Sequence, residues 1–271
     1  MPEGHVIHRL ANRINGLFAA KQVDVSSPQG RFAESAALID GTTLDHAETW
    51  GKHLFIAFDA DLPANVLQIH LGLIGQLKFT PLADPVGQVR VRIADDEWAA
   101  DLRGPQICRL ITGAEKARAT AKLGQDPLRA DADPEKAWAK VHRSSKPIAT
   151  LLLDQSIFAG VGNIYRAEVL FRHRIDPACP GGSLSRTSFD AIWADLVELM
   201  PLGVRDGRID TVYPEHTPEA MGRPARVDAH GGEVYVYRRA DQPCLVCGQT
   251  VREIELDGRN LFWCANCQHG H

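Results

Sequence analysis

The sequence predicts an α+β protein of several domains, with a β-sandwich first, a helical domain after it and a small metal-binding module at the end. Three observations predict this order. Short strand-like runs fill the first part of the chain, helical periodicity follows, and two Cys-x2-Cys pairs lie near the C-terminus. We expect a sandwich over 1–112, a linker over 113–130, a helical domain over 131–234 and a metal module over 235–271.

The β-sandwich is predicted from short strands that follow a single helix. Apolar residues recur every three or four positions from Val6 to Leu17, which predicts a helix ending near Gly16 or Phe18. The run Val89–Ile93 alternates strictly between apolar and basic residues, as a half-buried strand does. The other runs predicted as strands are 23–25, 53–58, 66–71, 76–79 and 108–111.

The middle of the chain is predicted to be helical. Asp133 and Pro134 form a typical helix start, because aspartate caps the N-terminus and proline fits the first helical position. From Ile209 to Glu233 the chain contains proline, glycine and arginine without a period, which predicts a long loop. The stretches predicted as helices are 115–123, 134–143, 147–154 and 189–200, and one more starts at Asn163.

Composition bounds the function only loosely. The chain has 271 residues, 44% hydrophobic and 24% charged, as globular proteins do. It has no apolar run near the ~20 residues of a membrane helix, and Met1–His5 lacks the apolar core of a secretory signal, so we expect a cytoplasmic protein. The net charge of −4 argues against nucleic acid, but residues 136–174 carry seven basic and two acidic residues. That stretch fits either a solvated helical face or a nucleic-acid surface.

The C-terminal module has the spacing of a structural zinc site. Its ligands would be four cysteines in the pattern Cys-x2-Cys-x16-Cys-x2-Cys, namely Cys244, Cys247, Cys264 and Cys267. Four thiolates complete a closed tetrahedral site for one Zn²⁺ ion. The alternative is a pair of disulfides, which would need an oxidising compartment. Cys108 and Cys179 have no partner at a comparable spacing.

A β-hairpin is predicted between the two cysteine pairs. Asp257-Gly258 lies between two alternating stretches, and this dipeptide is the strongest short-range hairpin signal. Arg259 would stand at or beside the tip. A guanidinium on a metal-stiffened hairpin suits phosphate recognition, although a lone surface arginine is more often only solvated.

The N-terminus carries a candidate nucleophile. Pro2 follows the initiator methionine, and a small second residue normally permits removal of Met1. The exposed secondary amine would have a pKa near that of an α-amino group, about 7.7–8.0, so a substantial fraction is neutral and nucleophilic at neutral pH. Glu3 beside it could serve as a general acid or base. Taken alone, Pro-Glu is also simply a common way to start a helix.

Several motifs occur together in one order along the chain: Pro2-Glu3-Gly4, Trp50-Gly51-Lys52, His70-Leu71-Gly72, AGVGNIY at 159–165 and the four-cysteine hairpin. Together they closely resemble the formamidopyrimidine-DNA glycosylase/endonuclease VIII family, nearly end to end. Gly4 followed by His5 looks more like the endonuclease VIII branch, especially its actinobacterial and plant-like members. The resemblance implies a two-layer β-sandwich with a flanking helix, a helix–two-turn–helix domain and a β-hairpin zinc finger.

The resemblance also implies the activity and its catalytic residues. The family removes damaged bases from DNA and then cleaves the strand. The nitrogen of Pro2 would attack C1′ of the damaged nucleotide, form a Schiff base, and lead to elimination at the 3′ and then the 5′ phosphate. Glu3 resembles the proton donor to the sugar ring, and Lys52 the lysine that holds a phosphate and assists the sugar chemistry. Arg259 matches the finger arginine that grips the phosphates around the extruded nucleotide.

Further residues match DNA-binding positions of the family. Asn163, with Gly162 before it, matches the phosphate-binding asparagine of the two-turn loop, where a helix N-terminus offers amides to an anion. Glu168 matches the carboxylate behind the nucleophile, and His70 belongs to the DNA-binding His-Leu-Gly motif. The chain would act as a monomer on damaged DNA, because one chain suffices to clamp one flipped nucleotide.

The sequence departs from the family where the emptied base stack is filled. The family uses a bulky residue after His-Leu-Gly and an Arg/Phe pair from a later loop. Leu73 is an acceptable wedge, but the later loop has only Arg103 and no aromatic residue. We therefore expect tolerance of single-stranded or bubble DNA. The loop 209–233 does not match the family segment that closes over oxidised purines, which favours oxidised pyrimidines such as 5-hydroxyuracil or thymine glycol.

Two other classes of protein remain open from the sequence. A non-catalytic damaged-DNA-binding protein could keep the fold and the zinc hairpin, although it has no need of the Pro2 amine beside Glu3. A zinc-ribbon scaffold for protein contacts would explain the cysteines but none of the N-terminal features.

Overall fold

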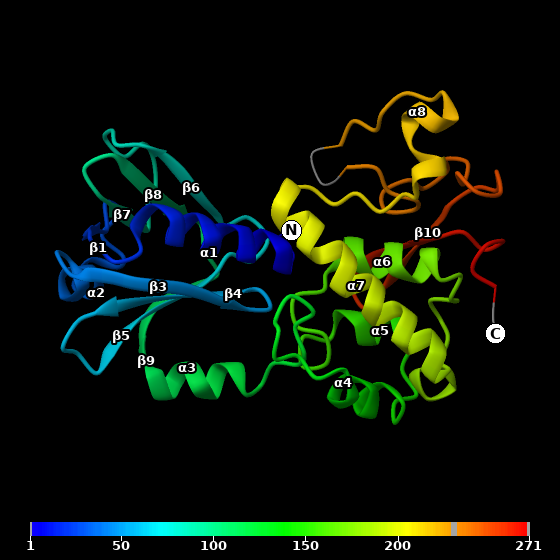
Figure 1. Ribbon diagram of the computed structural model, residues 1–271, viewed down its shortest axis with the longest axis horizontal. Helices are drawn as coiled ribbons and strands as arrows, with labels where there is room; N and C mark the ends of the chain where they lie inside the picture. The colour runs from blue at the N-terminus through cyan, green and yellow to red at the C-terminus, as the bar shows by residue number, and fades with distance from the viewer. Residues whose placement is uncertain (1, 229–231, 270–271) are drawn as a thin grey trace. The chain divides into compact units, whose positions relative to one another are not determined.

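A computed structural model describes residues 2–228 and 232–269 of the chain (Figure 1). The chain divides into two compact units, Met1–Lys122 and Leu123–His271. We call them unit 1 and unit 2. In the part of the chain that the structure describes, no helix has both the length and the apolar character needed to cross a membrane.

Unit 1 contains two antiparallel β-sheets. The five-stranded sheet has the order β1-β3-β4-β5-β9, and the four-stranded sheet has the order β2-β7-β8-β6. The first sheet consists of β1 (Lys21–Gln22), β3 (Thr43–Trp50), β4 (His53–Asp59), β5 (Ala64–His70) and β9 (Ile107–Thr112). The second consists of β2 (Asp24–Ser26), β7 (Val91–Ala94), β8 (Trp98–Arg103) and β6 (Gln76–Pro81). The predicted sandwich is confirmed, with β1, β3 and β8 added to the strands expected from the sequence.

The core of unit 1 lies on one face of the five-stranded sheet. Along β4, Leu54, Ile56 and Phe58 join a buried cluster that also holds residues of the second sheet and of α1 (Gly4–Phe18). Phe55 points to the opposite face and packs in a separate small cluster. This alternation follows from the two-residue period of a strand, and it leaves the outer face of the sheet available for polar residues.

The helices of unit 1 cover the sheets. Besides α1, unit 1 contains α2 (Ala33–Ile39) and α3 (Gly113–Thr120). Thr112 and Glu115 form a reciprocal capping box that starts α3, which packs against β5 and β9. The segment 113–130, expected as a linker, therefore begins with a capped helix that belongs to unit 1.

Unit 2 combines the helices and the C-terminal hairpin in one core. Its longer helices are α4 (Pro134–Val141), α5 (Ile148–Leu153), α6 (Asn163–Arg172) and α7 (Arg186–Asp206), and its hairpin is β10 (Arg252–Leu256) with β11 (Arg259–Trp263). A short 3-10 helix, η1, spans Gly181–Ser183. One hydrophobic cluster runs from Phe158 and Phe189 of the helical part to Leu261 and Phe262 of the hairpin. The helical domain and the metal module, expected as separate domains, therefore share a core.

The segment 209–233 was expected to be a long loop, and it contains two short helical turns, η2 (Pro214–His216) and α8 (Pro218–Met221). Its ends are tied together, because the amide of Thr211 donates to the carbonyl of Glu233 at 2.9 Å. Residues 229–231 lie outside the described residues.

Candidate active site and metal centre

The N-terminus leads directly into α1. Glu3 is the N-cap residue of this helix, its carbonyl accepts from the amide of Val6 at 3.0 Å, and it is buried. Pro2 lies just before the helix and is half-buried. Met1, whose removal the sequence analysis requires, lies outside the described residues. The helix therefore holds Glu3 in a defined place, one residue from the candidate amine.

The direction of α1 determines where these residues lie. The amide of Ala20, just beyond the helix, donates to the carbonyl of Leu44 at 2.8 Å, and the side chain of Asn15 bonds both to the carbonyl of Ala47 (2.8 Å) and to its amide (2.6 Å). The helix α1 therefore runs antiparallel to β3, so residues nearer the start of α1 lie beside residues nearer the end of β3. The start of α1 lies at the end of unit 1 where β3 turns into β4 (Figure 1).

Lys52 stands in that turn. Trp50 pairs with His53, so Gly51 and Lys52 form a two-residue hairpin loop. Gly51 has a φ of 60°, a left-handed value that suits glycine at the first central position of a II′ turn. We call this end of unit 1 the N-terminal rim: it holds the start of α1, the Gly51–Lys52 turn, the loop 71–75 and the loop 104–106.

A pair of histidines lies beside Lys52 at the rim. His53 and His70 are cross-strand partners with ring centroids 4.8 Å apart. Gln68 is buried, accepts from Nε of Arg109 at 2.8 Å and therefore turns its amide nitrogen to Nδ1 of His53 at 3.2 Å. Nδ1 of His53 thus accepts, and its Nε2 carries the proton of the neutral ring. His53 was not among the candidate residues chosen from the sequence, although its place directly after Lys52 was a signal.

Burial keeps both rings neutral. It lowers the pKa of His53 to about 4, with further lowering by the charges of His70 and Arg109. Burial also lowers the pKa of His70, as does the positive charge of Lys52, while a hydrogen bond from His70 to Gln106 opposes this shift. Nδ1 of His70 accepts from the amide of Gly72 at 3.2 Å, so its proton is on Nε2 as well. At neutral pH the rim therefore holds two neutral imidazoles beside the Lys52 ammonium, and the N–H of His70 is bonded to Gln106.

The loop 71–75 exposes two aliphatic side chains. Leu73 is 72% exposed and Ile74 is 80% exposed. The loop is tight, because a Cβ on Gly75 would lie 2.2 Å from the carbonyl oxygen of Leu71. Adjacent exposed apolar side chains form a contiguous patch, and such patches are typical of interaction sites. Leu73 was expected as the wedge, and Ile74, which sequence analysis did not single out, is beside it.

Arg103 is held by its own unit. Its guanidinium donates to Asp101 at 2.9 Å and to the carbonyl of Val86 at 2.9 Å. The sequence suggested Arg103 as a partial substitute for the missing aromatic wedge. In the structure it instead ties the loop around Val86 to β8, and insertion into DNA would require these bonds to break.

In unit 2, the turn before α6 is braced by one side chain. Gln155 accepts from the amide of Gly160 at 3.0 Å and donates to the carbonyl of Val161 at 3.0 Å. Gly160 has a φ of 93°, which requires glycine, and Gly162 is the N-cap of α6. This arrangement presents Asn163 at the first position of the helix, where the helix dipole favours an anion.

Asn163 is linked to the hairpin through a buried arginine. The side-chain amide of Asn163 donates to the carbonyl of Asn260 at 2.9 Å, and the guanidinium of Arg166 donates to the same carbonyl at 2.9 Å. Arg166 also donates to the side-chain oxygen of Asn163. Arg166 is fully buried and was counted from the sequence only as part of a basic stretch.

The predicted hairpin is present. Leu256 pairs with Arg259, so Asp257 and Gly258 form a two-residue loop, and their φ values of 52° and 71° are those of a type I′ turn. Arg259 is exposed at the first position after this turn. The hydroxyl of Thr150 in α5 donates to the carboxylate of Asp257 at 2.6 Å and fixes the tip against the helix.

A pocket of about 390 Å³ lies beside this tip, within unit 2. Its lining comes from α5, from the residues that flank this helix and from the hairpin, and it includes Lys146, Thr150, Asp154 and Arg259. Lys146 and Arg259 bring two positive charges to this recess, and Asp154 and Asp257 bring two negative charges. Sequence analysis included Lys146 only in its count of basic residues.

Glu168 lies deep in unit 2. Its carboxylate accepts from the amides of Tyr235, Val236 and Tyr237 at 2.7–2.9 Å and from the hydroxyl of Thr211 at 2.6 Å. It is fully buried, so it has no surface with which to contact DNA. The sequence suggested a DNA-binding residue behind the nucleophile, whereas in the structure the carboxylate bonds to the start of the metal module and to the segment 209–233.

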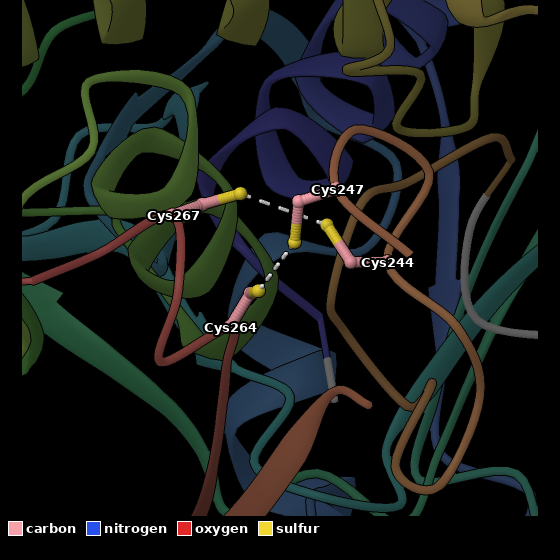
Figure 2. A group of neighbouring side chains, drawn as sticks. All are labelled: Cys244, Cys247, Cys264 and Cys267. Carbon is pink, nitrogen blue, oxygen red and sulfur yellow. Dashed lines mark hydrogen bonds between the residues drawn. The ribbon is translucent and has the colours of Figure 1, made fainter. Parts of the chain in front are cut away.

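The four predicted zinc ligands come together in unit 2 (Figure 2). Their sulfur atoms all lie within 4.8 Å of one another, with Cys244 and Cys267 at 3.9 Å and Cys247 and Cys264 at 3.5 Å. A tetrahedron of sulfurs around Zn²⁺ at ~2.3 Å has edges of about 3.8 Å, so the donor set and its spacing fit one zinc ion. Gln268, which is buried, links the site to the helices by accepting from the amide of Cys264 and donating to the carbonyl of Ile175.

Comparison with known proteins identifies the same three parts of the chain, namely the N-terminal β-sandwich, the helical region and the zinc finger. Three family models match in order: the formamidopyrimidine-DNA glycosylase N-terminal domain over residues 1–107, its H2TH domain over 123–213, and a zinc finger found in FPG and IleRS over 241–270. Endonuclease 8 1 of Mycobacterium tuberculosis is 49% identical over 99% of this chain and 100% of its own length. Probable endonuclease 8 2 of Streptomyces coelicolor is 31% identical over 100% and 95%.

Solved structures show the same fold. A Lactococcus lactis formamidopyrimidine-DNA glycosylase, solved with DNA containing an AP site, is 19% identical, covers 98% of this chain and 99% of its own, and has a TM-score of 0.79. The Thermus thermophilus protein of the same name is 24% identical, covers 100% of both chains and has a TM-score of 0.76.

The chain belongs to the formamidopyrimidine-DNA glycosylase/endonuclease VIII family. It is therefore a bifunctional base-excision repair enzyme, a DNA glycosylase with AP lyase activity, and its zinc finger holds one structural zinc ion. The family, the fold and the metal predicted from the sequence are confirmed.

Proposed function

We propose that this enzyme excises oxidised bases, with a preference for pyrimidines, and that the nitrogen of Pro2 is its nucleophile once Met1 has been removed. The observation that carries the proposal is the antiparallel run of α1 along β3, which brings the Pro2-Glu3 end of the helix to the same rim as Lys52. The relatives named endonuclease 8 support the same activity.

The chemistry follows from these three residues. The neutral secondary amine of Pro2 attacks C1′, the bond from C1′ to the base breaks, and Glu3 donates a proton to the sugar ring as it opens to the Schiff base. Loss of a C2′ proton then breaks the bond to the 3′ phosphate, and a second elimination releases the 5′ phosphate. Lys52 holds a phosphate and lowers the cost of the negative charge on these leaving groups.

Binding energy must offset the cost of extruding the nucleotide, which is roughly a few kcal/mol. We assign this role to donors of both units: His70 and Lys52 at the rim, and Arg259, Asn163 and the Gly162 cap in unit 2. A small number of well-oriented hydrogen-bond donors is enough to bind the DNA phosphates, so the net charge of −4 does not prevent DNA binding. One chain supplies every group that the reaction needs, and we propose a monomer acting on DNA in the bacterial cytoplasm.

The N-terminal rim also influences which form of DNA, single-stranded, bubble or duplex, the enzyme accepts. Leu73 and Ile74 provide an aliphatic wedge, whereas Arg103 is tied to Asp101 and Val86. With few groups to read the opposite base, the enzyme should accept lesions in single-stranded and bubble DNA as well as in duplex.

A panel of oligonucleotides tests the proposal. Zinc-loaded protein is incubated with 5-hydroxyuracil, thymine glycol or an oxidised purine, each in single strand, bubble and duplex, and base release and strand cleavage are followed. We expect kcat/KM for the pyrimidine lesions to exceed that for the purine by at least about tenfold, which corresponds to about 1.4 kcal/mol. Faster excision of the purine, or a large preference for duplex, would contradict the proposed specificity.

A further inference from the structure

A second pocket in unit 2 has no part in the function derived above. It has a volume of about 350 Å³ and lies between the end of the segment 209–233 and the start of the metal module. We call it the arginine pocket, because its lining includes four arginines with two acidic residues: Arg223, Arg226, Arg238, Arg239, Asp228 and Glu233.

The acidic residues neutralise only part of this charge. Glu233 accepts from the guanidinium of Arg223 at 2.7 Å and from the backbone amide of Arg226 at 2.6 Å. Asp228 accepts from the guanidinium of Arg226 at 2.6 Å, while the guanidinium of Arg238 is 3.8 Å away from it. Among the described residues of the lining, four guanidinium groups face two carboxylates, which is a formal charge of +2.

The guanidinium of Arg239 is hydrogen-bonded to neutral oxygens, while the charge of the buried Glu168 carboxylate acts on it from nearby. It is buried, and its guanidinium donates to the carbonyls of Tyr235 (2.6 Å) and Pro243 (2.9 Å) and to the side-chain oxygen of Gln242 (3.2 Å). These oxygens are all neutral. Glu168 offsets part of the cost of burying this charge, but the guanidinium groups of Arg223 and Arg226 repel it, so an anion in the pocket would be favourable.

Arg223 gives a second sign that the lining is incomplete. Within the described residues its Nε is buried and has no hydrogen-bond partner. A buried N–H donor without an acceptor is unfavourable, and an anion in the adjacent pocket is a group that could accept from it.

Arg238 occupies a conformation that arginine rarely adopts. Its φ is 53°, in the left-handed region where glycine is favoured, and its side chain is 45% exposed. Backbone strain of this kind is found most often at binding sites and other functional positions. The strain thus places a guanidinium at the open side of a pocket that already carries excess positive charge.

We propose that the arginine pocket binds a phosphate dianion, either inorganic phosphate or the phosphomonoester at the end of a nucleic-acid strand. A guanidinium fork matches the oxygens of phosphate, and a monoester carries about −1.5 to −2 at pH 7, which balances the charge of the lining. An internal phosphodiester of DNA carries a single charge and leaves part of the excess uncompensated.

The test uses two variants that change the backbone in the same way. Arg238→Gly removes one pocket charge and relieves the strain at φ 53°. Arg174→Gly is the matched control, because Arg174 is also an exposed arginine in unit 2 with a left-handed φ, of 56°, but it does not line the pocket. Both variants should fold at least as well as the wild type, since glycine prefers this region.

Phosphate binding to the zinc-loaded full chain is measured by calorimetry and by the rise in melting temperature, against sodium chloride at equal ionic strength. We expect one phosphate site in the wild type and in Arg174→Gly, and a Kd raised by about tenfold or more in Arg238→Gly, from the loss of one charge-assisted contact. No binding beyond the chloride control, or equal binding by Arg238→Gly and the wild type, would overturn the proposal.

Two further titrations identify the source of the phosphate. Short single strands with a 5′ phosphate or a 5′ hydroxyl are compared in the wild type and in Arg238→Gly. If the phosphorylated strand binds more tightly and Arg238→Gly removes the difference, the pocket takes a strand end. If the two strands bind equally while inorganic phosphate still binds, the pocket takes the free ion.

Discussion

The guanidinium of Arg166 donates to the backbone carbonyl of Asn260 at 2.9 Å, which joins the start of α6 to the zinc hairpin. The side chain of Asn163 donates to the same carbonyl. The residue proposed to bind phosphate on α6 and the strand that carries Arg259 are thus held in one hydrogen-bonded group. Arg166 can therefore affect DNA binding without contacting DNA, because it holds other DNA-binding residues in place.

Replacement of Arg166 by methionine should therefore weaken DNA binding. Arg166→Met removes the donors to Asn260 and Asn163 while it keeps a long apolar side chain at a buried position. We expect the Kd for lesion-containing DNA to rise by about tenfold, or about 1.4 kcal/mol, with bound zinc unchanged. Arg186→Met, which removes an exposed arginine of the same unit, is the control. Tight binding by Arg166→Met would show that the link is dispensable.

Glu168 should matter for stability. In Glu168→Gln an amide NH₂ would face one of the donors that now bind the carboxylate, the amides of Tyr235–Tyr237 and the hydroxyl of Thr211. We expect the free energy of unfolding of unit 2 to fall by about 1–3 kcal/mol in urea. Glu198→Gln, on the exposed side of α7, should change it by less than about 0.5 kcal/mol. An unchanged unfolding midpoint in Glu168→Gln would refute the positioning role.

The exposed pair in the loop 71–75 should act only on paired DNA. In the double variant Leu73→Ala with Ile74→Ala, no large side chain remains to fill the emptied stack. We expect excision from duplex to slow by about tenfold or more, and excision from single strands to stay within about twofold of the wild type. Val86→Ala, which shortens another exposed aliphatic residue of unit 1, should leave both rates unchanged. Equal losses on both kinds of DNA would exclude a wedge.

His53 should make unit 1 sensitive to acid. Burial holds the pKa of folded His53 at about 4, below its ordinary value of 6.5, so between these values the unfolded chain binds more protons. Stability is then complete above pH 6.5 and is lost as the pH falls towards 4. Between pH 7 and 4.5 we expect His53→Asn to lose about 2 kcal/mol less than the wild type. Urea unfolding at the two pH values measures this, and parallel losses in both proteins would contradict it.

Local features of this fold could be predicted from the sequence. The Asp257-Gly258 turn and the spacing of the cysteines depend on a few neighbouring residues, and both are present in the structure. Strand β3 was missed because the bulge between Leu44 and His46 breaks its alternation. The segment 209–233 was predicted as a loop, but its path could not be predicted, because its anchors, such as the bond from Thr211 to Glu168, join residues far apart in the chain.

The site residues can also be divided into those that a local motif identifies and those whose role depends on distant parts of the chain. Sequence motifs were enough to choose Pro2, Glu3 and Lys52 as candidates. That these residues lie at the same end of unit 1 depends on α1 running antiparallel to β3, and contacts of Ala20 and Asn15 with β3 establish this direction. The role of Glu168 depends on amides 67–69 residues away. No local pattern distinguishes such a buried carboxylate from one that faces DNA.

The central claim is that the processed N-terminus performs the attack. Borohydride reduces a Schiff base to a stable bond, so the wild type, Pro2→Gly and Lys52→Gln are trapped on DNA with an oxidised pyrimidine, and the cross-linked peptide is located by mass spectrometry. We expect the adduct on the nitrogen of Pro2 in chains that have lost Met1, and little trapping by Pro2→Gly. An adduct on Lys52 or another side chain, or full trapping by chains that keep Met1, would contradict the account.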